Sequence, residues 1–170
     1  GRTPLPAGRE VVLEGVGGAS VEIQAEIDVA GSPMVELDVL RSPDREEVTR
    51  VGFYRQRGYR NWERAERNKE LSALEASDSL VSLDTSYSST LPEALSRAPE
   101  TAPVYLGPDE TLRLSVFIDR SIVEVFVNGR QCVAARVYPG REDSVGISLR
   151  SQGRDAVLES MDVWQMNGIY

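Results

Sequence analysis

The chain has 170 residues, of which 41% are apolar and 27% are charged, and its formal net charge is -8. This length suits one domain, the negative charge disfavours attraction to nucleic acid, and the apolar runs are too short to cross a bilayer. The sequence has no histidine and one cysteine, which excludes Ser-His-Asp catalysis, the commonest zinc sites and an internal disulfide.

The N-terminal part of the chain alternates apolar and polar side chains with a period of two. Val21 and Ile23, for example, are separated by Glu22 and followed by Gln24. This pattern predicts half-buried strands at residues 11–16, 21–27, 35–39 and 48–54. The opening residues do not resemble a signal peptide, so we expect the chain to begin inside a longer polypeptide.

Residues 53–62 gather four aromatic side chains and three arginines. Saccharides bind on flat aromatic faces flanked by planar polar groups, so this segment is a candidate carbohydrate platform. The alternative is that these rings pack under the following loop or against another domain. The candidate sugar-binding residues are Tyr54, Arg57, Tyr59, Arg60 and Trp62.

Two segments interrupt the strand pattern. Residues 58–77 are charged and rich in helix formers, but their apolar residues do not follow a 3.6-residue period, so we expect a long loop with at most a helical turn. Thr90 as N-cap, Pro92 in the first turn and Glu93 three residues after the cap predict a short helix near 91–97.

Further strands are predicted at residues 80–84, 112–118, 122–127, 131–138, 145–149 and 156–164, with turn residues between them. About ten or more short strands without alternating helices indicate an all-β fold. We expect a two-sheet antiparallel β-sandwich that forms a single domain over residues 1–170.

Asn128 and Gly129 predict a hairpin with a two-residue type I′ turn, because both positions of that turn need positive φ. Such a turn would pair Val125 with Cys132 and would bury the cysteine in the core. The opposite face of these strands would mix apolar residues with a few polar ones, which is typical of a docking surface. The expected docking residues are Phe117, Ile122, Phe126 and Val133.

Acidic residues are numerous enough that a glycosidase-type carboxylate pair must be considered. Asp119 lies in a tight connection where it can cap backbone N–H groups. Glu124 lies between residues that favour burial, so it is either a tuned catalytic acid or a partner in a structural ion pair. The remaining acidic clusters, at 44–47, 109–110 and 142–143, lie in turn-like segments and are expected to be solvated.

The runs D-R-S-I-V-E-V-F (119–126) and R-V-Y-P (136–139) are followed by D-V-W (162–164) and preceded by S-L-D (82–84). Over residues 80–166 the chain resembles the C-terminal sandwich of glycoside hydrolase family 32, which includes invertases, inulinases and levanases. The resemblance implies a lectin-like jelly roll, and it departs from the family at Thr85, where many relatives have arginine. The residues to which the resemblance assigns a structural role are Asp84, Asp119, Arg120, Ser121, Glu124, Arg136, Tyr138 and Pro139.

In that family the chemistry belongs to a five-bladed propeller that precedes the sandwich. Its aspartate nucleophile, its glutamate acid/base and its R-D-P aspartate lie in motifs that this sequence lacks. The resemblance therefore implies a module with no catalytic residue, no cofactor and no metal, whose partner is a propeller of the same or another polypeptide. Many fructan-degrading enzymes are secreted or periplasmic, but this sequence does not fix the compartment.

Three functional hypotheses follow. The first is an accessory module that stabilises a catalytic propeller, with a second copy of the chain as a further candidate partner. The second is a carbohydrate-binding module that recognises fructan or another oligosaccharide. The third is a stand-alone glycosidase that uses Asp119 and Glu124.

Overall fold

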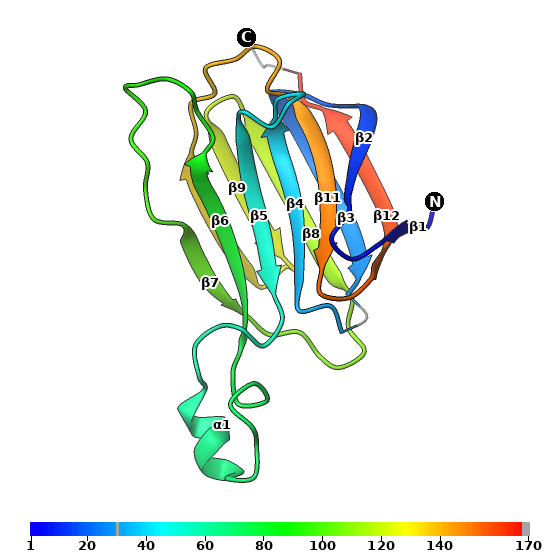
Figure 1. Ribbon diagram of the computed structural model, residues 1–170, viewed down its shortest axis with the longest axis vertical. Coiled ribbons are helices and arrows are strands. Elements are labelled where there is room, and N and C mark those ends of the chain that lie inside the picture. The colour runs from blue at the N-terminus through cyan, green and yellow to red at the C-terminus, as the bar shows by residue number, and fades with distance from the viewer. Residues whose placement is uncertain (30, 168–170) are drawn as a thin grey trace.

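The computed structural model describes residues 1–29 and 31–167, and these residues form two six-stranded antiparallel sheets packed face to face. Sheet I contains, in spatial order, β1 (Thr3–Leu5), β12 (Ala156–Gln165), β3 (Ser20–Asp28), β8 (Leu112–Asp119), β9 (Ile122–Val127) and β10 (Gln131–Arg136). Sheet II contains β2 (Glu10–Gly17), β11 (Gly146–Gln152), β4 (Met34–Arg41), β5 (Val48–Tyr54), β6 (Ser79–Tyr87) and β7 (Glu100–Val104). In Figure 1 sheet II lies in front of sheet I. The predicted all-β sandwich is confirmed.

The alternating pattern decides which residues fill the space between the sheets. On β3, Val21, Ile23 and Ile27 are fully buried, while Glu22 and Gln24 lie on the opposite face. Sheet II contributes fully buried Leu37 and Leu83 to the same core. Each such aliphatic side chain stabilises the fold by about 1.5–3 kcal/mol when it leaves water. The core is therefore continuous across the sandwich.

The hairpin between β9 and β10 forms, but the predicted register is wrong by one residue. Asn128 and Gly129 have the expected positive φ values of 50° and 64°. However, β10 begins with Gln131 opposite Val127, so residues 128–130 form the loop. The Asn128 side chain accepts from the Arg113 backbone N–H at 3.0 Å, which keeps Asn128 paired with β8 and shifts the extra loop residue to the β10 side.

This shift exchanges the two faces of β10. Val133 lies opposite Val125 and is buried in the core, so it does not belong to the expected docking face. Cys132 lies opposite Phe126 on the outer face and is exposed, so the prediction of a buried cysteine is also wrong. A one-residue change of register moves every side chain of a strand to the other face.

Only a single turn forms where a short helix was predicted near 91–97. In that turn the Ala94 N–H donates to the Leu91 carbonyl at 3.1 Å. Both Thr90 donors, the backbone N–H and the hydroxyl, bind the carboxylate of Glu47. The threonine hydroxyl therefore joins two distant segments instead of capping a helix.

The one helix in the described part of the chain is α1 (Trp62–Arg67), inside the segment that was expected to be a long loop. Asn61 is its N-cap, and its side-chain oxygen accepts from the Arg64 N–H at 3.0 Å. The segment 58–77 leaves the end of β5 and projects away from the sandwich as an arm (Figure 1). None of the described helical segments has the length and apolar character that crossing a membrane would require.

Candidate functional site

Two of the runs that carry the family resemblance, 119–126 and 136–139, meet at one end of the sandwich; we call these the signature runs. The first is the connection between β8 and β9, where Arg120 has φ of 53° and its N–H donates to the Ala19 carbonyl. The second leaves β10, where the Val137 N–H donates to the Ser121 carbonyl at 2.9 Å. Tyr138 and Pro139 follow and, with Arg120 and Ser121, line a largely apolar cavity of about 390 Å³. The fold thus gathers residues from two separate runs around a single cavity.

Glu47 holds the rim of this cavity in place. Its carboxylate is fully buried and accepts hydrogen bonds from Thr90 N–H and hydroxyl, Gly140 N–H, Arg141 N–H and the Ser144 hydroxyl, at 2.6–3.1 Å. Burial alone would raise the pKa of Glu47, but these hydrogen bonds outweigh it and lower the pKa to about 2. The prediction that Glu47 is a solvated turn residue is therefore wrong.

The other acidic signature residues are not set up as a buried catalytic pair. Glu124 lies on the outer face of sheet I between Phe117 and Ala134 and is exposed, as is Asp119. The expected burial of Glu124 is wrong. Without burial there is no physical reason to expect a catalytic acid with a shifted pKa at this position. Asp84 accepts from the Ser86 N–H at 2.9 Å, which gives it a local structural role.

Three of the four expected docking residues do lie on the outer face of sheet I. Ile122 and Phe126 are 40% and 37% exposed, and the rings of Phe117 and Phe126 pack edge to face with centroids 5.9 Å apart. Trp164 of β12 lies in the same cross-strand row as Phe117 and is also exposed, although the sequence reasoning did not include it. The solvated face of an antiparallel sheet usually carries polar side chains, so these exposed aromatic residues are unusual for such a face.

The residues predicted to bind sugar do not share one cavity of the described structure. Tyr59 and Trp62 are exposed on the arm, where the Arg60 guanidinium lies 4.9 Å from the Trp62 ring centre. Tyr54 lies on the outer face of sheet II, on β5. Arg57 lines a separate cleft, and none of the other four candidate sugar-binding residues lines that cleft. The five candidate sugar-binding residues therefore do not form one surface in the described structure, and sugar binding by this segment stays a prediction.

An ionic layer on the outer face of sheet II was not anticipated. Glu36 and Asp38 of β4 are almost fully buried beneath arginine side chains, and Arg45 binds Asp38 at 2.6 Å. Burial and then the charge of Glu36 raise the pKa of Asp38 to about 6. The signal available in the sequence was the pair of acids at two alternate positions in the middle of β4, which lie opposite Arg50 and Arg150 on its neighbours.

Comparisons with known proteins give a consistent result. The family described as "Glycosyl hydrolases family 32 C terminal" matches residues 5–165. The levanase of Bacillus subtilis (strain 168) is 28% identical over 161 residues, which cover 94% of this chain and 20% of the levanase. The raffinose invertase of Escherichia coli is 42% identical over 64 residues, which cover 37% of this chain and 13% of that protein.

Solved structures agree in fold. Fructan 1-exohydrolase IIa from Cichorium intybus superposes with a TM-score of 0.79 at 16% identity, covering 99% of this chain and 36% of that one. Exo-inulinase from Aspergillus awamori superposes with a TM-score of 0.70 at 18% identity, covering 99% of this chain and 28% of that one. The chain thus spans 28–36% of these two solved structures and a fifth or less of these two curated relatives.

Proposed function

The chain belongs to the C-terminal domain family of family 32 glycosyl hydrolases, and we propose that it is the accessory sandwich of a β-fructosidase. In this role it docks on the catalytic propeller and stabilises it, while the propeller performs the hydrolysis. The large share of each relative that lies outside the matched region supports this reading. The names of those relatives point to fructans and sucrose-like sugars as the substrate class.

The observation that carries the proposal is the outer face of sheet I. Aromatic and aliphatic surface is left in water on a face whose other side chains are charged, polar or small; it belongs to Phe117, Ile122, Phe126 and Trp164. Interfaces combine a few such apolar anchors with polar surroundings. We assign the propeller as the occupant, because the relatives attach much additional polypeptide to a module of this size.

The cavity at the signature end supplies a second anchor point. Its apolar lining includes Leu40, Leu91 and Val137, and Glu47 fixes the two loops that form its rim. A preformed cavity of this kind can receive an apolar side chain without ordering cost on the receiving side. The signature residues Arg120 and Tyr138 thus acquire a role as part of a socket for the propeller.

The test is reconstitution. The coding sequence that precedes Gly1 is read, the propeller it encodes is co-expressed with this chain, and the pair is purified through a tag on the propeller. We expect co-purification with the natural chain and its loss with Ile122→Asp, whereas Glu14→Ala, on the exposed part of β2, leaves it unchanged. Absence of an encoded propeller, or equal capture of both variants, would contradict the docking role.

A further inference from the structure

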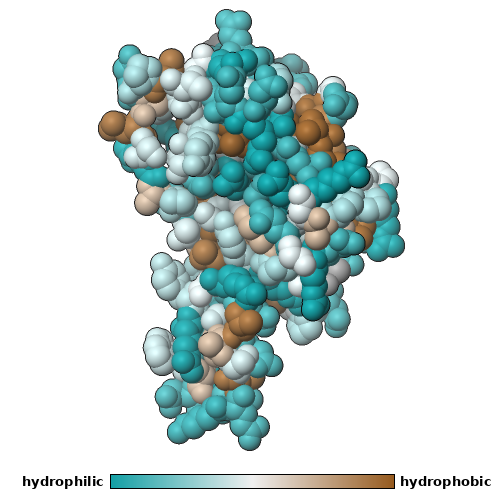
Figure 2. Space-filling view, viewed as in Figure 1, coloured by the Kyte–Doolittle hydropathy of each residue, from teal (hydrophilic) through white to brown (hydrophobic). Residues whose placement is uncertain are grey.

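A cleft lies where the arm leaves the sandwich, and we call it the arm-base cleft. Its walls come from three connections at one end of the sheets (Figure 1): residues 31 and 33 between β3 and β4, residues 55–57 after β5, and residues 153–154 between β11 and β12. Leu74 of the arm completes the lining. The surface where the arm joins the sandwich is strongly hydrophilic (Figure 2). The cleft has a volume of about 420 Å³, which falls within the range of small-molecule sites.

Backbone contacts hold these three connections together. The Arg55 N–H donates to the Pro33 carbonyl at 3.0 Å, and Gly153 lies so close to Pro33 that a side chain at position 153 would collide with the proline ring. Gln56 and Gly153 have positive φ values of 50° and 82°, so the chain turns sharply at both positions. The residues next to these two turns are therefore placed around the same cleft.

Three arginines line the arm-base cleft, and among the described residues no acidic side chain lines it; they are Arg55, Arg57 and Arg154. The Arg154 guanidinium lies over Gly31, with its Nη1 3.7 Å from the point that a Cβ would occupy there. Within the described part of the chain, none of the three guanidinium groups forms an ion pair or a hydrogen bond. Their charges are therefore available to a ligand.

The acidic residues that adjoin the lining along the chain are bound elsewhere. Asp155 follows Arg154, and its carboxylate accepts from the Ala7 N–H at 2.8 Å. Glu75 follows Leu74, and its carboxylate accepts from the N–H of Ser72 within the arm at 2.9 Å. Neither carboxylate is among the groups that line the cleft.

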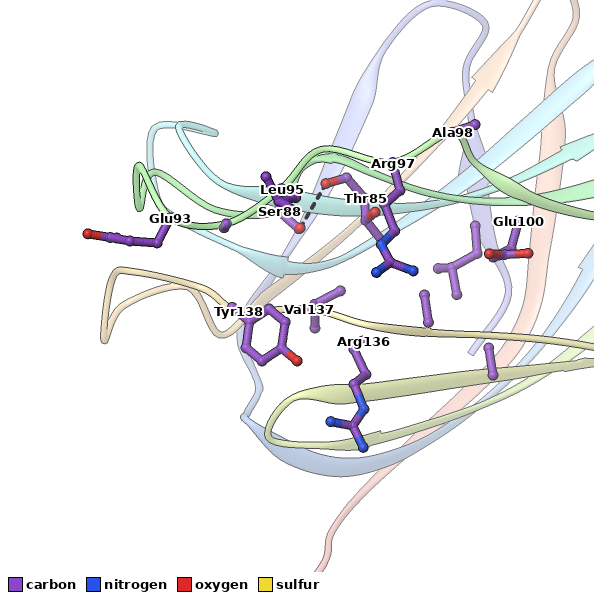
Figure 3. Close-up of a pocket in the computed structure, with 14 residues that line it drawn as sticks. Thr85, Ser88, Glu93, Leu95, Arg97, Ala98, Glu100, Arg136, Val137 and Tyr138 are labelled. Atoms are coloured by element: carbon purple, nitrogen blue, oxygen red, sulfur yellow. Dashed lines mark hydrogen bonds between the residues drawn. The ribbon is translucent and has the colours of Figure 1, made fainter.

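Other arginine-rich surfaces of the described structure differ in this respect. The cleft between β7 and β10 (Figure 3) is lined by Arg97 and Arg136, but Glu93 and Glu100 belong to its lining as well. The arginines on the outer face of sheet II cover buried carboxylates. In a chain with 27 acidic and 19 basic residues, arginines would be expected to meet acids. The arm-base cleft is thus selective for negative charge.

The chemistry of the cleft also selects the kind of anion. A planar carboxylate is satisfied by one bidentate guanidinium, whereas a phosphate group directs its oxygens to several sides and carries close to two negative charges. Arginines from two separate connections suit the phosphate. The net charge of -8 does not oppose binding strongly, because charges more than about 8 Å away are largely screened at physiological ionic strength. Pro33 and Leu74 add apolar surface for a carbon skeleton beside the phosphate.

We propose that the arm-base cleft binds a phosphate group, either as the free ion or as part of a small phosphate ester. Arg154 donates to the phosphate oxygens from one connection, and Arg55 and Arg57 donate from the other. None of the residues that line this cleft lines the docking socket or belongs to the docking face of sheet I. The phosphate site is therefore independent of the proposed docking role.

Isothermal titration calorimetry of the full chain with inorganic phosphate and with glucose 6-phosphate tests the proposal. We expect saturable one-to-one binding, weakened at least about fivefold by Arg55→Leu and by Arg154→Leu, because each removes charge-assisted donors. Arg154→Lys should also weaken it, because an ammonium group does not offer the planar fork of a guanidinium. These side chains are exposed or half-exposed, so the variants should fold and keep the natural Tm. Glucose alone should not bind.

Arg60→Leu is the matched control. It removes the same charge from the arm, but Arg60 packs over Trp62 and does not line the cleft, so the affinity should change by less than about twofold. Leu74→Ser distinguishes the two sources of phosphate: weaker binding of glucose 6-phosphate alone supports an ester, and equal affinities throughout support the free ion. No saturable binding of either probe, or equal losses in Arg60→Leu and Arg154→Leu, would overturn the phosphate site.

Discussion

Glu47→Ala tests the idea that one buried carboxylate organises the signature end of the sandwich. The substitution removes the acceptor for five hydrogen bonds that come from two separate segments, Thr90 and residues 140–144. A hydrogen bond to a charged group contributes about 1.5–3 kcal/mol, but these five act as a unit and water can enter the vacated space, so we expect a total loss of about 3 kcal/mol. For a domain of this size that loss lowers Tm by about 6–12 °C.

The lowered pKa of Glu47 supports the same loss of stability. The folded-state pKa of about 2 lies below the ordinary value of 4.5, and this difference corresponds to about 3 kcal/mol of folding stability. That figure is an upper limit, because nearby solvent screens the charge. Because the folded pKa is lowered, this contribution is present above pH 4.5 and is lost as the pH falls towards 2. The difference between Glu47→Ala and the natural chain should therefore be largest at neutral pH and should shrink in acid.

Urea denaturation at pH 7 and at pH 3 measures both effects, and amide hydrogen exchange at Gly140 and Arg141 reports the loosening of the rim. Glu46→Ala is the matched control, because the neighbouring Glu46 is exposed and makes one ion pair with Arg141. That control should lose less than about 1 kcal/mol. Equal losses in the two variants, or a Glu47→Ala effect that does not depend on pH, would refute the reasoning.

Four further predictions follow from the structure. The isolated chain should release no sugar from sucrose, inulin or levan, because the described residues include no flanking nucleophile and acid/base pair; turnover that disappears in Glu124→Gln would contradict this. Phe126→Ser should weaken association with the propeller yet change the free energy of unfolding by less than about 1 kcal/mol, whereas a cost of about 3–5 kcal/mol would assign Phe126 to the core. Cys132 should react with a thiol reagent in the native protein, and Val133→Ala should cost about 2 kcal/mol while Cys132→Ser is nearly neutral; the reverse order would restore the predicted register. Asp38 has a raised pKa of about 6, so its contribution is full below pH 4 and up to about 3 kcal/mol of stability should be lost as the pH rises to 7; denaturation curves of Asp38→Asn should lack this loss, and an unchanged pH profile would contradict the role of the ionic layer.

The sequence by itself determined the class of fold and most of the inner faces. The strict alternation around Val21 and Ile23 needs only the two-residue period of a strand, and that period is a local property of the backbone. The tight connection after β8 was equally readable, because Asp119 and the residues beside it favour turns. The signature runs then placed the chain in its family without any knowledge of contacts.

Tertiary structure decided the features that depend on distant partners. The register of β10 was set by the side chain of Asn128, which binds Arg113 on a strand outside the hairpin. The helix expected after Thr90 was replaced by a bond to Glu47, 43 residues earlier in the chain. Local patterns specify which conformations are favourable for a segment, but a polar side chain is satisfied by whichever partner the fold brings near, and that choice is made only when the two sheets pack.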